Sequence, residues 1–265
     1  MEVHHHPKVE KKNFKEYLLE GFMIFIAVML GFFAESYREH LSEQSKEREY
    51  ISSLRNDLGM DTAHINTFVE GFSMRIQQFD SLIGMLQNPA NVSYGAEMYY
   101  LGRLATRGTV FGDINNTLAQ LNSSGNFRLI SKRDIVDNIV TYQNHIENFK
   151  EVHDIDTQEQ LALYPYLGNV FNAFVFDSML SITTDTTADP NNTELASGFR
   201  RAVHRPNGNP QLISTNAEQI NLLVYHLHQR KGTFVAECRL LYTQKQQAKK
   251  LIEMINKEYH LKSES

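Results

Sequence analysis

The hydrophobic pattern of the chain is dominated by one apolar run near its start, YLLEGFMIFIAVMLGFFA, from Tyr17 to Ala34. Glu20 is the only charged residue in this run. As a helix, its roughly 18 residues would measure about 27 Å, which is short but sufficient to cross the hydrocarbon core of a bilayer. We therefore predict a transmembrane helix over residues 17–34.

Three other interpretations of this run fit less well. Its flanks, VEKKNFKE before and ESYREHLSEQSKERE after, are too polar for a helix buried in a globular core. The run begins late for a cleavable signal peptide, and it contains Glu20. It also lacks the polar face of an interfacial amphipathic helix.

The pattern after the run changes from polar to helical. Residues 35–49 are nearly all polar and place opposite charges such as Glu35 and Arg38 one turn apart, which predicts a solvated helical stalk. Over residues 51–86 apolar side chains recur at steps of three, four and seven. No proline interrupts this stretch, so one helix, with a bend possible at Gly59 or Gly71, is predicted from the cytoplasmic side to about residue 87.

Two further long helices are predicted. The first begins near Lys132 and continues to about Phe174, with a kink expected at Pro165. The second begins at a capping box of Thr215 and Glu218 and continues to about residue 260. Three long segments of similar length are what a helical bundle requires.

Shorter elements connect these helices. We predict short helices over residues 97–104, 113–125 and 195–203, the second capped by Asp113, and a long surface connection over residues 176–213. The fold class is therefore all-α, with one N-terminal transmembrane helix continuing into an elongated extramembrane bundle of about three long helices plus short helices. If the long helices alternate in direction, the chain runs out, back and out, and the short helices lie at the far end.

The lysines before the span predict its orientation. The short basic side of a span usually stays in the cytoplasm. We therefore predict a cytoplasmic tail over residues 1–16, the transmembrane helix over 17–34, a stalk over 35–49 and a helical domain over 50–265 on the outside, which is the periplasm in a Gram-negative cell. The basic residues are Lys8, Lys11, Lys12 and Lys15.

A seam of small residues follows Glu20 along the span. At about 100° per residue, Ala27, Gly31 and Ala34 lie within about 40° of the line through Glu20. Ala27 and Gly31 form a small-xxx-small pair, which favours close helix association in lipid and predicts a homo-oligomer. Glu20 either faces a partner in this seam or snorkels to the headgroup region.

Composition adds a few limits. The 265 residues are 42% hydrophobic and 22% charged, which is ordinary for a globular protein. The net charge of −5 argues against a nucleic-acid partner. Cys238 is the only cysteine, so an intramolecular disulfide and a thiolate metal cluster are excluded.

Three segments carry a family resemblance: YLLEGFMIFIAVMLGFFAES, KEREYISSLRNDLGMD and TLAQLNSSGNFRLISKRDIVDNIVTYQNHIE. They resemble a family of bacterial single-pass membrane proteins catalogued only as a domain of unknown function. The likeness covers residues 14–150 and departs after the span, where family members often carry asparagine and tryptophan and this chain has Glu35-Ser36-Tyr37. It implies a bacterial inner-membrane setting without an activity. The matching positions are Glu20, Glu49, Tyr50, Leu54, Asp57, Leu58, Asp61, Leu118, Leu121, Ser123, Ser124, Gly125, Leu129 and Ile130.

The sequence contains no recognisable catalytic motif. His226 and His228 point about 200° apart on a helix and cannot share a metal, whereas His145 and His153 lie two turns apart and could share a face. Neither pair forms a zinc-protease or di-iron pattern. We therefore predict that the chain is not an enzyme and uses no cofactor.

Two functions remain. The first is a structural or accessory scaffold subunit that oligomerises and docks a membrane or periplasmic protein. The alternative is a sensory or ligand-binding bundle, which would report through another membrane protein because a tail of about 16 residues is too short for a signalling domain. A weaker third interpretation gives clustered Glu20 side chains a role in proton or ion coupling.

Overall fold

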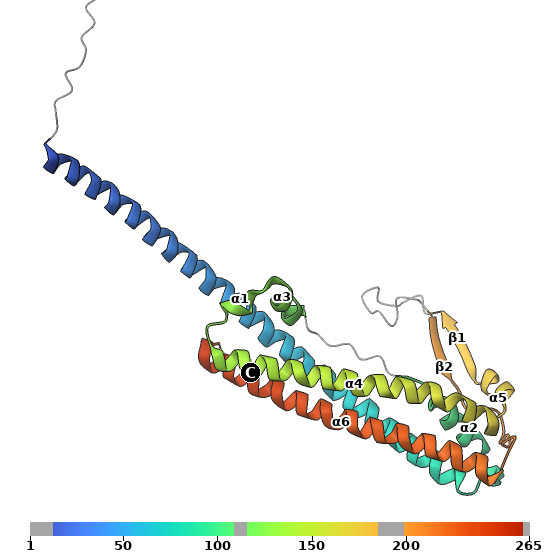
Figure 1. Ribbon diagram of the computed structural model, residues 1–265. Helices are drawn as coiled ribbons and strands as arrows, with labels where there is room; N and C mark the ends of the chain where they lie inside the picture. Colours follow the sequence, from blue (N-terminus) through green and yellow to red (C-terminus); the bar gives the residue numbers. More distant parts are fainter. Residues whose placement is uncertain (1–12, 109–115, 185–198, 262–265) are drawn as a thin grey trace, which may run out of the picture.

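The computed structural model describes residues 13–108, 116–184 and 199–261, and it is helical throughout except for one small hairpin (Figure 1). The predicted all-α fold is confirmed. In chain order the elements are α1 (Phe14–Leu86), the 3-10 helix η1 (Val92–Tyr94), α2 (Gly95–Leu104), α3 (Asn116–Ser124), the 3-10 helix η2 (Asn126–Leu129), α4 (Arg133–Val170), α5 (Ala173–Ser178), β1 (Leu180–Thr184), β2 (Phe199–Val203) and α6 (Ala217–Tyr259).

Helix α1 is a single 73-residue helix, about 110 Å long at 1.5 Å per residue. It begins after Asn13, whose backbone N–H donates to Glu16 Oε2 at 3.0 Å. Its first half projects beyond the other elements, and its second half packs along α6 (Figure 1). Side chains of α1 such as Asp61 and Phe72 also contact α4. The prediction of one unbroken helix to about residue 87 is confirmed.

The three long helices do not alternate in direction. Helices α1 and α4 both run away from the projecting end, and α6 returns towards it, packing antiparallel to both (Figure 1). Helix α2 lies at the distal end of the bundle, whereas α3, η2 and the start of α4 lie at the proximal end, beside the point where α1 leaves it. Helix α4 therefore starts from the same end as the bundle part of α1 and runs parallel to it.

The core is divided into two apolar clusters along the bundle. The proximal cluster joins Leu54 and Leu58 of α1 with Ile139 of α4 and Leu251 of α6. The larger distal cluster is built from aromatic and aliphatic side chains. Its aromatic centre is formed by Phe72, Phe79, Phe149 and Phe234, with ring centroids 5.4 to 6.5 Å apart.

Several local predictions are wrong. Residues 199–203 form strand β2 rather than a helix, and β2 pairs antiparallel with β1, Leu180 opposite Val203. The cap of α6 is Asn216, whose side chain accepts from the N–H groups of Glu218 and Gln219, in place of Thr215. Helix α4 ends at Val170 rather than near Phe174, and Pro165 lies within it. The Asp113 cap lies outside the described residues.

Candidate functional site

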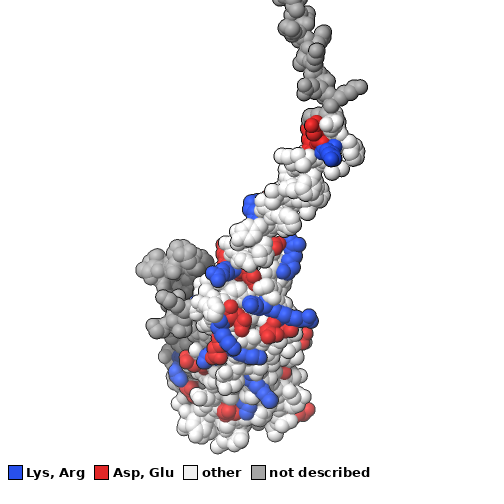
Figure 2. Space-filling view, turned by 90° about the vertical axis from the view of Figure 1, so that its left-hand side faces the viewer, with Lys and Arg blue, Asp and Glu red and all other residues white. Residues whose placement is uncertain are grey.

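The projecting part of α1 carries the predicted span. Among the described residues, α1 is the one helix long and apolar enough to cross a membrane, with a mean hydropathy of 2.1 over its most apolar window. None of that window is buried, which excludes a core helix of this chain. Figure 2 shows this segment as an almost uninterrupted uncharged column, with charges at its tip and near the bundle.

The predicted seam lies on this column. Glu20, Ala27, Gly31 and Ala34 are all exposed, so no other part of the described chain covers them. A side chain added at Gly31 would meet nothing within 4 Å. The seam is therefore open to a partner or to lipid, and the fold of one chain does not require its small residues.

Two of the matching positions, Tyr50 and Asp57, lie where α1 enters the bundle, at a site we call the proximal junction. The site comprises Glu47, Tyr50 and Asp57 of α1 with Thr117, Asn126, Ser131 and Tyr259. The backbone N–H of Thr117 donates to Asp57 Oδ2 at 2.9 Å, which satisfies the start of α3. Asn126 Nδ2 donates to Tyr50 Oη at 2.7 Å. Both bonds fasten the α3 and η2 segment to the stalk.

Glu47 is the centre of the proximal junction. Its Oε1 accepts from the backbone N–H of Ser131 at 2.7 Å, from Ser131 Oγ at 2.9 Å and from Tyr259 Oη at 2.5 Å. Burial and the adjacent Glu47 carboxylate raise the pKa of Tyr259, so its hydroxyl stays a donor. One carboxylate thus ties the start of α4 and the end of α6 to α1.

Apolar contacts complete the proximal junction and unite the two halves of the family-like motif. Leu54 and Leu58 from the first half and Leu118, Leu121 and Ile130 from the second half are all buried in the proximal cluster. Gly125 adopts a φ of 67° between α3 and η2, a conformation that glycine reaches without strain. The motif residues that were matched by sequence alone are therefore neighbours in space.

Some of the matching positions make no comparable contact at the proximal junction. Glu49 is exposed. Ser123 and Ser124 are also exposed, and their hydroxyls donate to the Gln120 carbonyl of their own helix. Leu129 is half-buried in η2.

Further buried polar contacts lie between the long helices, from the proximal junction towards the distal end of the bundle. Tyr142 Oη donates to Asp61 Oδ2 at 2.6 Å, and Gln244 Nε2 lies 3.3 Å from the same hydroxyl, so this layer joins all three long helices. Further along, His153 Nδ1 lies 2.7 Å from Glu237 Oε1. Burial raises the pKa of Glu237, with the hydrogen bond from His153 opposing the shift.

Arg230 forms a fully buried ion pair with Asp156, which we call the distal clasp. Its side chain is 0% exposed and pairs with Asp156, Nε to Oδ1 at 2.7 Å and Nη2 to Oδ2 at 3.1 Å. The same guanidinium donates to the backbone carbonyls of Ala105 and Arg107. It therefore holds the irregular segment after α2 against α4 and α6.

Two further side chains bind the same segment. Gln160 Nε2 donates to the Thr106 carbonyl at 2.6 Å, and Arg75 Nη1 donates to the Leu104 carbonyl at 3.0 Å. Burial and repulsion from nearby Arg230 lower the pKa of Arg75. Each long helix thus supplies a donor to the chain that leaves α2.

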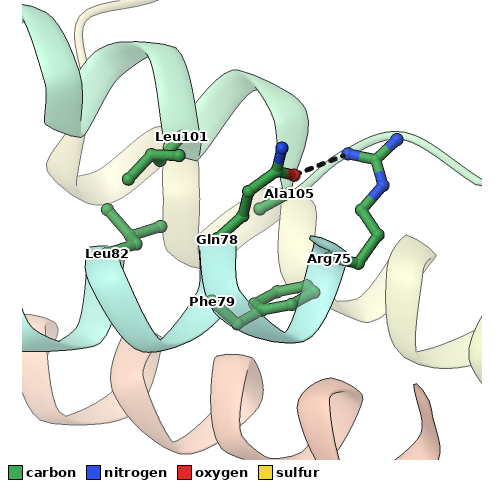
Figure 3. A pocket seen from close by; sticks show the side chains of 6 residues that line it. All are labelled: Arg75, Gln78, Phe79, Leu82, Leu101 and Ala105. Atoms are coloured by element: carbon green, nitrogen blue, oxygen red, sulfur yellow. Dashed lines mark hydrogen bonds between the residues drawn. The ribbon is translucent and has the colours of Figure 1, made fainter. Parts of the chain in front are cut away.

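Beside Arg75, α1 and α2 enclose a small cavity (Figure 3). Leu82 and Leu101 form its apolar end, and Arg75 donates to Gln78 at the other. Its volume of about 10 Å³ is close to the minimum for one water molecule. It is a packing gap and too small for an organic ligand.

The larger clefts are open to solvent. One of about 350 Å³ lies between α3 and α4, beside Ala119 and Lys150. Another, of about 370 Å³, lies at the distal end between α1 and α6, beside Leu86, Val224 and His228. Neither contains the buried polar side chains described above.

The histidines do not assemble a metal centre among the described residues, where no group of three His, Cys, Asp or Glu side chains is placed to hold an ion. His226 stacks on Tyr166 with ring centroids 4.0 Å apart. His153 bonds to Glu237 rather than to His145. These contacts give both His226 and His153 a structural role.

Comparison of the chain with protein-family models, curated proteins and solved structures found no match in any of the three. The candidate site is therefore described from the contacts and burial of its residues alone. Sequence reasoning missed the distal clasp and the role of Glu47. A signal existed for Asp156, because the apolar stripe of α4 weakens over residues 154–158.

Proposed function

We propose that the chain is a membrane-anchored structural or accessory scaffold subunit, which oligomerises through its span and holds its helical domain for a partner protein. The observation that carries this proposal is the continuity of α1. One helix contains both the exposed apolar column and side chains of both clusters of the bundle core. A body joined in this way cannot swing freely on a linker.

The proximal junction supports the same role. Glu47, Tyr50 and Asp57 bind three separate elements at the point where α1 leaves the bundle. The helical domain is thereby locked to the stalk about 13 residues, or roughly 20 Å, beyond Ala34. Such rigidity suits a spacer that presents a docking surface at a fixed height above a membrane.

We place the chain in a bacterial inner membrane, with residues 1–16 cytoplasmic and the bundle periplasmic. The lysines before the span and the resemblance to the single-pass family support this placement. The open seam of Glu20, Ala27, Gly31 and Ala34 supports a homo-oligomer. Both the orientation and the oligomer belong to the proposal.

The test is purification of the full chain from membranes in mild detergent, followed by mass measurement of the complex and identification of co-purifying proteins. The proposal expects an oligomer with a stoichiometric partner. A monomer without a partner would contradict the scaffold role. Protease added to intact spheroplasts should degrade the bundle, and protection of the bundle would contradict the orientation.

A ligand-binding bundle is the second candidate, and the distal cleft beside Leu86, Val224 and His228 favours it. Its volume of about 370 Å³ falls within the range of small-molecule sites. A ligand there would bridge α1 and α6 and raise the melting temperature. A screen of small metabolites that leaves the melting temperature unchanged would count against this function.

A further inference from the structure

The side of α1 that faces away from the bundle is in line with the seam of the span. At about 100° per residue, the core residues Leu58 and Ile65 lie about 160° to 180° from Glu20. Asn56, Ala63 and Thr67, by contrast, each follow a seam position by 36 residues, about ten full turns. On one unbroken helix the seam and this second surface therefore lie on the same side.

We call this second surface the outer face of α1. Its central side chains are exposed, and two of them are large and apolar, with Met60 47% and Met74 60% exposed. Among the described residues 56–81, Glu70 is the only charged side chain within about 60° of the seam line. The outer face comprises Asn56, Met60, Ala63, Thr67, Gly71 and Met74.

Neighbouring elements flank the outer face without covering it. On one flank α6 binds α1, with Lys231 Nζ 2.7 Å from Asp80 Oδ1. On the other flank α3 and the segment after α2 bind it, through Asp57 and Arg75. Both flanks have partners inside the chain, and the strip between them is open to another molecule.

The glycines of α1 have no explanation within one chain. A side chain added at Gly59 or Gly71 would meet nothing within 4 Å. Glycine inside a helix costs about 1 kcal/mol relative to alanine. Small residues on an exposed helical face let a second helix approach closely, the same property for which Ala27 and Gly31 predict association of the span.

We propose that the outer face of α1 binds the outer face of a second copy of this chain, in parallel and continuous with the seam. The proposal rests on the membrane-anchored oligomer proposed above. Copies inserted in one membrane are parallel, and pairing their seams turns their outer faces towards each other about a two-fold axis. Apart from Glu70, which would lie near its own copy, the face carries no charge that would repel a second copy, and exposed methionines adapt to an irregular contact.

Disulfide crosslinking in native membranes tests this contact. All variants carry Cys238→Ser, which removes the single native thiol. Ala63→Cys probes the outer face, Ala27→Cys probes the seam, and Val235→Cys, exposed on α6, is the matched control. Mild oxidation should give a dimer band for the outer-face and seam probes and none for the control.

The outcomes separate this inference from the proposed function. A dimer from Ala27→Cys without one from Ala63→Cys would overturn the outer-face contact and leave the oligomer standing. Dimers from neither probe would overturn both. A crosslink of Ala63→Cys to a species other than a second copy would mean that a different protein covers the face. Adding Met60→Glu and Met74→Glu should abolish the Ala63→Cys dimer, and an unchanged band would also overturn the contact.

Discussion

Glu47 and Tyr259 lie 212 positions apart in the sequence and share a hydrogen bond of 2.5 Å at the base of the bundle. The bond joins the last residue of α6 to the stalk, next to the start of α4. The bond therefore holds the helices of the bundle together at the end that is nearest to the span. The rigidity of the scaffold therefore depends on a carboxylate that local sequence patterns assign to a solvated stalk.

Removing this hydrogen bond should destabilise the bundle. Tyr259→Phe keeps the ring but leaves the buried Glu47 carboxylate with one donor fewer, which should cost about 1–3 kcal/mol. Denaturant unfolding of the purified chain measures the loss. Tyr242→Phe, at an exposed site on α6, is the control and should cost less than about 0.5 kcal/mol. Equal stabilities of the two variants would contradict the assigned role.

Breaking the distal clasp should destabilise the bundle more than removing the Tyr259 hydroxyl. Arg230→Met leaves Asp156 buried without its partner, so the free energy of unfolding should fall by about 3–5 kcal/mol. Adding Asp156→Leu should recover part of this loss. Recovery should be incomplete because the carbonyls of Ala105 and Arg107 still lack their donor.

The control for the clasp is Lys150→Met, which breaks an exposed pair with Glu147 and should change stability by less than about 1 kcal/mol. Each variant is compared by its denaturant midpoint at constant slope. If Arg230→Met unfolds at the same midpoint as Lys150→Met, Arg230 does not hold the segment after α2.

The raised pKa of Glu237 should make the stability of the bundle depend on pH. Its pKa is raised above the ordinary 4.5 because its side chain is desolvated, with Asp156 adding repulsion and His153 and Arg230 opposing it. In the window above pH 4.5 the folded chain keeps a proton that the unfolded chain has released, so stability from this group falls as pH rises. Glu237→Gln should remove that fall. Melting temperatures of both proteins across about pH 4–8 measure it, and parallel curves would contradict the prediction.

Two glycines should respond in opposite directions. A side chain at Gly95 would collide with the backbone carbonyl of Pro210 and lie 2.8 Å from the Asn209 carbonyl carbon, so Gly95→Ala should destabilise the packing of α2. Gly59→Ala meets nothing within 4 Å and should stabilise the isolated chain by about 0.5–1 kcal/mol. Thermal unfolding in detergent compares them, and a loss of stability in both would show that α1 is packed differently.

Much of the fold followed from local pattern. The apolar run, the unbroken α1 and the inward stripes of α4 and α6 depend on helical periodicity, which neighbouring residues determine. The arrangement of the helices in space could not be predicted from local pattern. Helix α3 lies against Asp57, at the opposite end of the bundle from α2, and only long-range contacts such as Thr117 with Asp57 and Asn126 with Tyr50 fix this position.

The polar residues of the site were harder to predict for a different reason. Glu47, Asp156, Arg230 and Glu237 are buried, although residues of these types are normally exposed. Periodicity places Arg230 and Glu237 on the inward face of α6, yet their partners lie on α4 or after α2. A buried charge becomes interpretable only when the element that pairs with it is known.

The central claim is that the exposed apolar part of α1 anchors the chain in a lipid bilayer. Lysed cells that express the full chain are centrifuged at high speed without detergent, and the pellet is washed with alkaline carbonate. The account predicts that the chain stays in the washed membranes and is released by detergent. Recovery of the chain in the first supernatant would contradict the anchor, and with it the scaffold and the paired outer faces.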